Sequence, residues 1–118
     1  MSNKGLKYDD GKLLMSLVKP EFIEGVAEVL TYGANKYAPN SWQNVEDGKR
    51  RYTDALLRHL NQYLKGEEKD DESGLEHLKH IATNIMFLQH LDDNNSKPDK
   101  CNCNNKDIYY KFISSFRE

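Results

Sequence analysis

The sequence predicts an all-α protein, an antiparallel helical bundle, and two observations carry this prediction. Apolar residues recur at helical spacing in three segments, over about residues 20–37, 50–65 and 74–91, whereas a strand-like period of two never persists. Proline and glycine lie at the ends of these segments, where they begin or end helices. A chain of 118 residues fits one domain.

The first expected helix begins at Pro20, because proline is tolerated in the first helical turn. Phe22 and Leu30 belong to its apolar stripe, and the segment 38–41, Ala-Pro-Asn-Ser, interrupts the repeat. We therefore expect this helix to end near Tyr37.

The second expected helix ends at Gly66, since glycine readily adopts the left-handed conformation that closes helices. Ser73 and Glu76 are spaced as a capping box, which predicts that the third helix starts just after Ser73. The apolar repeat of the third helix ends near Leu91.

Beyond Leu91 the composition changes. Residues 92–105 are rich in Asp and Asn, and we expect a polar linker there. Residues 106–118 again carry apolar side chains at helical spacing and predict a short amphipathic helix, which leaves residues 1–91 as the main domain. Three helices give a thin core, so we expect a second copy to complete it, in a dimer or tetramer.

Composition and charge exclude several function classes. The net charge is −2, and the 31% of charged residues have both signs interspersed, which argues against binding to duplex nucleic acid. No apolar run reaches the ~20 residues of a membrane span, and the polar N-terminus does not resemble a signal peptide, so we expect a cytoplasmic protein without membrane contact. Cys101 and Cys103 alone do not make a structural zinc site, and we expect reduced thiols.

The first expected helix carries three carboxylates on one face. Glu21, Glu24 and Glu28 are spaced by three and four residues, which places them within two turns. Carboxylate oxygens suit Mg²⁺, which usually binds one or two carboxylates together with phosphate oxygens and water. The alternative is an acidic face that contacts only water.

The third expected helix carries His77, His80 and Asn84 with the same spacing. Imidazoles in a row can bind a transition metal, contact phosphate or transfer protons, and they can equally be surface or core histidines. If the first and third helices pack antiparallel, the glutamates and the imidazoles face one cleft.

The second expected helix adds Asp54, Arg58 and His59. Asp54 and Arg58 are four residues apart, so they either form a surface ion pair or act as a carboxylate ligand and a phosphate-binding guanidinium. Lys12 and Lys36 flank the first helix and are candidate phosphate contacts or solubilising charges. Three aromatic residues either stack on a nucleotide base or pack in the core, namely Tyr32, Tyr37 and Trp42.

Several blocks of the sequence form a recognisable series of motifs. They are residues 7–12 (Lys-Tyr-Asp-Asp-Gly-Lys), 29–37, 40–42, 54–60, 66–67, 71–78 and Asn84. These blocks resemble, in the same order, the phage dATP/dGTP pyrophosphohydrolase N-terminal-domain family, and the resemblance covers about residues 6–91.

This family is similar to the all-α NTP pyrophosphatases, the MazG-like superfamily. The resemblance implies helical dimers or tetramers that cleave between the α and β phosphates and release a nucleoside monophosphate and pyrophosphate. The superfamily's E-x-x-E set on the first helix corresponds to Glu21, Glu24 and Glu28. The later E-x-x-D pair is missing, and His80 and Asn84 occupy that region.

Residues and resemblance together predict a pyrophosphohydrolase, dependent on Mg²⁺ or Mn²⁺, that acts on a purine (d)NTP such as dATP or dGTP. The sequence has no Gly-rich phosphate loop and no nucleophile elbow, so hydrolysis would use a metal-activated water. Glu24, Glu28 and Asp54 are the predicted metal ligands, and Glu21 is a metal ligand or general base. The predicted substrate-binding residues are Lys12, Lys36, Trp42, Arg58, His59, His77, His80 and Asn84.

Two other function classes stay open. A phage-encoded binding protein would trap a nucleotide signal of host defence, such as a cyclic nucleotide or an ADP-ribose derivative, and return it unchanged. The missing carboxylate pair favours this alternative. The third class is a helical scaffold whose acidic stripe is merely solvated.

Overall fold

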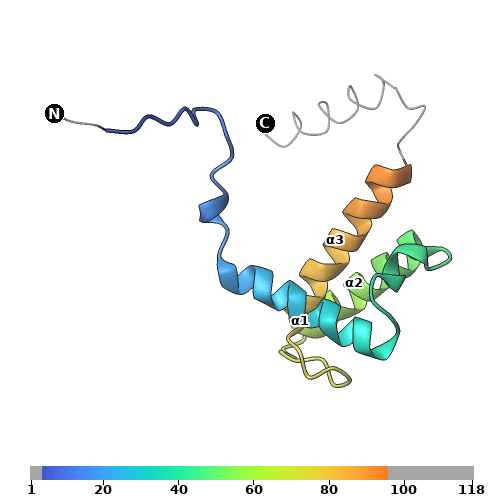
Figure 1. Ribbon diagram of the computed structural model, residues 1–118. Coiled ribbons are helices and arrows are strands. Elements are labelled where there is room, and N and C mark those ends of the chain that lie inside the picture. Colours follow the sequence, from blue (N-terminus) through green and yellow to red (C-terminus); the bar gives the residue numbers. More distant parts are fainter. Residues whose placement is uncertain (1–3, 96–118) are drawn as a thin grey trace, which may run out of the picture.

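The computed structural model describes residues 4–95, and these residues form an all-α fold (Figure 1). An isolated antiparallel bridge between Lys69 and Glu76 is the only β-type pairing among them. Within residues 4–95, no helix is long and apolar enough to span a membrane. The predicted all-α class is confirmed. The elements, in chain order, are η1 (Met15–Leu17), α1 (Pro20–Lys36), η2 (Ser41–Asn44), α2 (Gly48–Leu64) and α3 (His77–Asn95).

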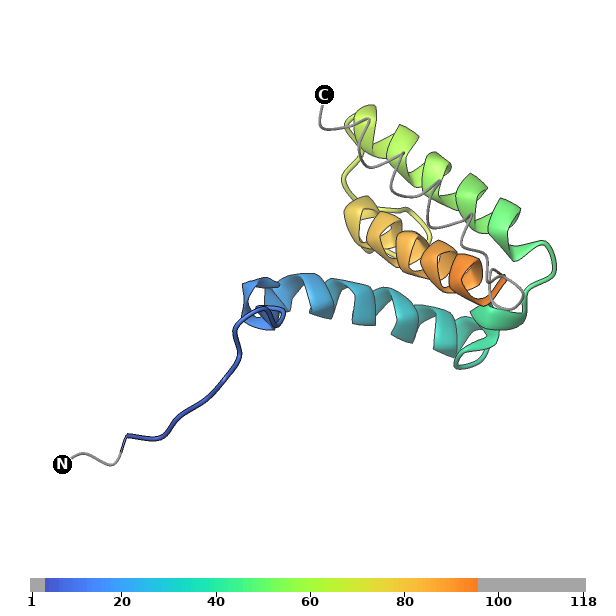
Figure 2. The ribbon, with the colours of Figure 1, turned by 90° about the horizontal axis from the view of Figure 1, so that it is seen from above.

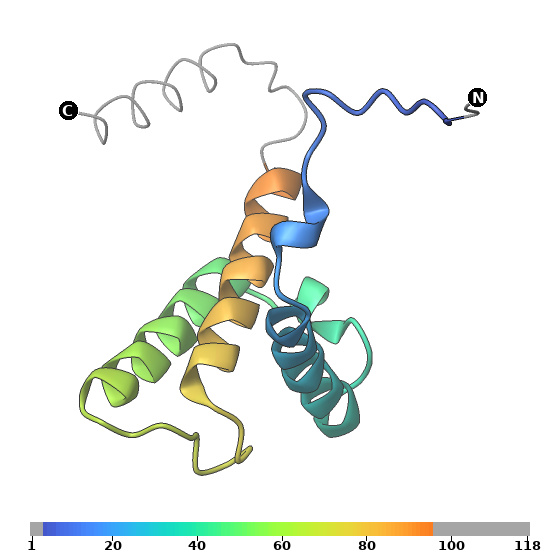
Figure 3. The ribbon, with the colours of Figure 1, turned by 90° about the vertical axis from the view of Figure 1, so that its left-hand side faces the viewer.

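α3 is the central helix of the three and contacts both α1 and α2. α2 and α3 run antiparallel side by side and are joined by the loop 65–76, as Figures 2 and 3 show. α1 crosses α3 and begins on the same side of the molecule as α3 in Figure 2, so these two helices are not antiparallel neighbours. This crossing decides which faces of α1 and α3 meet.

The boundaries of α1 and α2 lie close to the predicted ones. Pro20 occupies the first turn of α1, and the Tyr37 N–H donates to the Gly33 carbonyl at 2.8 Å where the helix ends. α2 begins at Gly48, slightly before the predicted residue 50. A Cβ atom at Gly48 would lie 3.3 Å from Leu91 Cδ1, so glycine allows the start of α2 to approach α3 closely.

The predicted start of α3 is wrong, because Ser73 does not cap the helix. The backbone N–H and the hydroxyl of Ser73 donate to Asp70 Oδ2, at 2.8 and 3.0 Å, and this local turn keeps Ser73 in the loop. α3 starts instead at His77, whose N–H donates to the Glu68 carbonyl at 2.9 Å.

The predicted end of α3 is also too early, since the helix continues past Leu91 to Asn95. An ion pair of 3.0 Å between Lys49 and Asp92 holds this extension beside α2. The rest of the predicted linker, residues 96–105, and the predicted C-terminal helix within 106–118 lie outside the described residues.

The centre of the described part is thin and partly polar. Val29, 9% exposed, is its one buried large apolar residue, whereas His77 and Thr83 are almost fully buried. Trp42, a residue of η2, stacks on Phe87 of α3 with ring centroids 4.3 Å apart, so η2 packs against α3. Polar groups therefore occupy space that apolar side chains fill in a typical helical bundle.

Candidate functional site

A cavity of about 1050 Å³ lies between the three helices. The last turns of α1 and the segment that follows them form one wall, and α2, α3 and the loop 65–76 contribute the others. This volume is near the upper end of small-molecule sites, roughly 300–1,000 Å³. Its charged and polar lining consists mainly of Lys36, Arg50, Arg51, Asp54, Arg58, His59, Asp70, Glu72, His80 and Asn84.

The structure brings a majority of the predicted site residues to this cavity. Those that line it are Lys36, Trp42, Asp54, Arg58, His59, His80 and Asn84. Those that do not are Lys12, Glu21, Glu24, Glu28 and His77.

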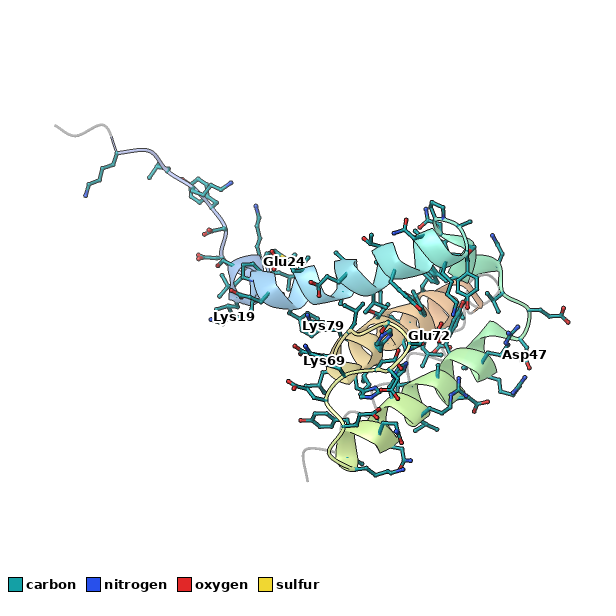
Figure 4. All side chains as sticks on the ribbon, turned by 90° about the horizontal axis from the view of Figure 1, so that it is seen from below. Lys19, Glu24, Asp47, Lys69, Glu72 and Lys79 are labelled. Atoms are coloured by element: carbon teal, nitrogen blue, oxygen red, sulfur yellow. The ribbon has the colours of Figure 1, made fainter. Side chains whose placement is uncertain are left out.

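The predicted groove shared by the α1 glutamates and the imidazoles is not formed within one chain. Glu28 Oε1 accepts a hydrogen bond of 2.6 Å from Lys79 Nζ, while Glu21 and Glu24 are exposed. Figure 4 shows Glu24 near the start of α1, away from Glu72 in the cavity wall. Because α1 crosses α3, the Lys79 face of α3 meets α1, and the histidine face turns toward α2.

Two arginines of α2 are the cations best placed to bind an anion in the cavity. Arg51 and Arg58 line it and make no ion pair or side-chain hydrogen bond with any residue that the structure describes. Arg50, by contrast, donates to Asp47 at 2.6 Å and to Asp54 at 3.2 Å. Asp54 therefore pairs with Arg50, and the alternative of a surface ion pair between Asp54 and Arg58 is not formed.

Lys36 is engaged by a carboxylate that the sequence interpretation overlooked. Its ammonium group forms a salt bridge with Glu72, and the Tyr32 hydroxyl donates to the same oxygen at 3.0 Å. The hydrogen bond from Lys36 holds the pKa of Glu72 below its ordinary value. Glu72 therefore neutralises part of the positive charge that Lys36 brings to the cavity, and it ties the loop 65–76 to α1.

Three imidazoles converge where α2, α3 and the loop 65–76 meet. His59 Nδ1 lies 2.8 Å from His77 Nδ1, and His77 Nε2 lies 2.7 Å from Glu67 Oε1. The rings of His59 and His80 stack with centroids 4.3 Å apart. Burial lowers the pKa of His59 to about 4 and also lowers the pKa of His80, so both rings are neutral at pH 7.

Ser73 connects His80 to the loop carboxylate Asp70. The Ser73 hydroxyl lies 2.7 Å from His80 Nε2 and donates to Asp70 Oδ2 at 3.0 Å. Although burial alone would raise the pKa of Asp70, the hydrogen bonds from Ser73 bring it below its ordinary value. Asp70 is therefore an ionised acceptor, and His80 Nε2–H donates to the Ser73 oxygen.

Sequence reasoning missed four loop residues of this site, namely Glu67, Asp70, Glu72 and Ser73. The segment from Glu67 to Glu72 carries consecutive charged residues, which usually mark solvated chain, so its composition does not point to a site. The signal that marks the segment is its position directly between two helices that both carry histidines, His59 on one side and His77 on the other.

The residues predicted to hold Mg²⁺ do not fit that ion within one chain. Glu28 pairs with Lys79 and Asp54 with Arg50, and Glu24 does not line the cavity. We therefore assign no step of a reaction to Mg²⁺. A different set of ligand atoms does converge in the described part of the chain, all within 4.8 Å of one another, from His59, Asp70 and His77.

Comparison with known proteins agrees with the resemblance seen in the sequence motifs. The family model described as "dATP/dGTP diphosphohydrolase, N-terminal" matches residues 2–101. A dATP/dGTP diphosphohydrolase of Salmonella phage PMBT28 is 40% identical over 95 residues, which are 80% of this chain and 32% of that protein. The chain thus spans about a third of the length of this relative. No solved structure matches. The chain belongs to the dATP/dGTP diphosphohydrolase N-terminal family.

Proposed function

We propose that this chain binds a purine nucleoside triphosphate, of the dATP or dGTP type, and hydrolyses it to a nucleoside monophosphate and pyrophosphate. Membership of the family and the activity for which the phage relative is named support this proposal. The observation that carries it is the cavity between the helices, into which α2 brings Arg51 and Arg58 without carboxylate partners among the described residues.

The two arginines suit a polyphosphate. A guanidinium group binds two phosphate oxygens at once, and it keeps its charge at all physiological pH values. Lys36 adds less charge, because Glu72 neutralises it. The triphosphate would therefore lie along α2, beside Arg51 and Arg58.

Tyr37 is the aromatic residue best placed to receive the base. It lines the cavity and is 71% exposed, so one face of its ring is accessible. Lys36 Nζ lies 5.1 Å from the centroid of the same ring. Trp42 is less suited to this role because its ring already stacks on Phe87.

The reaction requires a water molecule to attack the α phosphorus. The bond between that phosphorus and the oxygen bridging to the β phosphate breaks, and pyrophosphate leaves with the bridging oxygen. Asp54 is the one predicted catalytic carboxylate that lines the cavity, and we assign it the role of accepting the proton from water. Glu21, Glu24 and Glu28 lie outside it and would act on a nucleotide only from a second chain.

A product screen tests the proposal. The full chain is incubated with each of the eight common (d)NTPs and Mg²⁺ or Mn²⁺, and monophosphate and pyrophosphate are measured by chromatography. We expect release from dATP or dGTP, and at least a roughly tenfold lower kcat/KM in Arg58→Ala, since the arginine stabilises phosphate charge. Lys65→Ala, a cation just past the end of α2 and outside the cavity, is the matched control.

The screen has two outcomes that contradict the proposal. Recovery of bound nucleotide unchanged after denaturation would make the chain a sequestering protein. Absence of both nucleotide binding and products would support the third function class, a helical scaffold.

A further inference from the structure

We propose that His59, Asp70 and His77 form a binding site for one divalent transition-metal ion of the zinc type. Their ligand atoms lie within 4.8 Å of one another, and each residue comes from a different element, α2, the loop 65–76 and the first turn of α3. Two imidazole nitrogens and one carboxylate are a common ligand set for zinc, whereas Mg²⁺ prefers oxygen ligands alone.

The hydrogen bond between Glu67 and His77 sets the orientation of one ligand. An ionised carboxylate only accepts hydrogen bonds, so His77 Nε2 carries the proton that it donates to Glu67 Oε1 at 2.7 Å. His77 Nδ1 is then left with a lone pair, and it points at His59 Nδ1. A carboxylate behind a histidine in this way is the usual support of a metal-binding imidazole.

Asp70 is held equally firmly. Two hydrogen bonds from Ser73 fix its Oδ2, and the Asp70 N–H donates to the Leu75 carbonyl at 2.8 Å. Asp70 Oδ1 accepts no hydrogen bond from any group in the described part of the chain. The carboxylate therefore keeps one oxygen for an ion without losing its support.

The two histidine nitrogens need only a small adjustment to share an ion. Zinc–nitrogen bonds of about 2.0–2.1 Å at a tetrahedral angle separate two ligand nitrogens by about 3.3 Å. The two Nδ1 atoms are 2.8 Å apart, so they must separate by about half an ångström. His77 is 1% exposed and stays in place, whereas His59 is half-buried at the cavity edge and can move.

Three protein ligands leave the fourth position of a tetrahedral ion available. His59 and Asp70 also line the cavity, so two of the three ligands border the space proposed for the nucleotide. On binding, the His59 proton moves from Nδ1 to Nε2, and the imidazole stays neutral.

The test is a titration of Co²⁺ and Zn²⁺ without nucleotide, so its result does not depend on hydrolysis. The full chain carries Cys101→Ser and Cys103→Ser, because those two thiols are alternative zinc ligands. We expect one equivalent of Co²⁺, with the visible absorption of a four-coordinate ion, no thiolate charge-transfer band, and displacement by Zn²⁺. Absence of Co²⁺ uptake by this protein would overturn the proposal without any further substitution.

Substitutions assign the ligands. His59→Gln and Asp70→Asn should each weaken Co²⁺ binding at least tenfold, while circular dichroism shows unchanged helix content. The control is His90→Gln, at a histidine of α3 outside the cluster, and it should leave Co²⁺ binding unchanged. Glu67→Ala should weaken binding by about 10- to 100-fold, and Glu67→Gln, which still accepts from His77, by less. Unchanged affinity in both His59→Gln and Asp70→Asn would place the ion elsewhere.

Discussion

Tyr52 connects α2 to the segment that follows α1. Its hydroxyl donates to the Trp42 carbonyl at 2.9 Å, and its ring centroid lies 4.8 Å from that of Phe87. Tyr52→Phe keeps the ring and removes the hydrogen bond, which should lower the free energy of unfolding by about 1 kcal/mol in urea titrations. Tyr63→Phe, on the same helix with no hydrogen bond recorded among the described residues, should change it by less.

The contribution of Tyr52 should also depend on pH in one direction. Burial raises the pKa of Tyr52 above its ordinary value of 10.0, so the unfolded chain loses this proton before the folded chain does. The stabilisation is therefore complete below pH 10 and is lost as the pH rises through the folded-state value. The stability difference between the native protein and Tyr52→Phe should narrow above pH 10, and a constant difference would contradict the assignment.

At the scale of elements, the loop 65–76 holds the three helices together. Its carboxylates contact each of them, Glu72 through Lys36 and Tyr32 on α1, and Glu67 through Gln62 on α2 and His77 on α3. The antiparallel bridge between Lys69 and Glu76 closes the loop on itself. Its polar sequence therefore builds a tertiary contact, although such composition usually marks solvated chain.

Ser73 is the residue on which this loop depends most. Its hydroxyl contacts Asp70, His80 and the Leu75 N–H. Ser73→Ala leaves the Nε2–H of His80, which is 9% exposed, without a protein partner, so we expect a loss of about 1–3 kcal/mol in unfolding free energy. Thermal and urea unfolding measure it, with the exposed Ser16→Ala as control, and equal stability of both variants would refute the network.

At the scale of the whole molecule, the described part has too little apolar core for its apolar content. Large apolar side chains on η1 and the segments around it, up to the first turn of α1, are 47–83% exposed, and we call this stretch the apolar surface. Exposed apolar patches of this kind mark interaction sites. The apolar surface consists of Leu13, Leu14, Met15, Leu17, Val18, Phe22 and Ile23.

We expect a second copy of the chain to cover the apolar surface. Sedimentation velocity at micromolar concentration should show a dimer or tetramer, and the double variant Phe22→Glu, Ile23→Glu should shift it to monomer. Leu64→Glu, at a position that is 72% exposed at the far end of α2, should leave the assembly intact. A native protein that sediments as a monomer would end this expectation, and with it the proposed contribution of Glu21, Glu24 and Glu28 from a second chain.

Sequence alone determined the helices and much of the cavity lining. Pro20 and the Ala38-Pro39 break set α1, and Gly66 ends α2, because these residues act through local backbone geometry. Arg58 and His59 could be chosen from their position on one helix. Local rules suffice wherever a residue's effect stays within a few neighbours in the chain.

Only the tertiary structure decided which faces of the helices contact one another. Spacing places Glu28 on a face of α1 and His80 on a face of α3, yet the crossing of these helices, set by packing, turns Lys79 toward α1. The same holds for Ser73, whose local pattern fits a helix cap while Asp70 and His80 take its hydrogen bonds. Contacts between distant segments depend on helix rotation and crossing, and periodicity within a single helix carries no information about either.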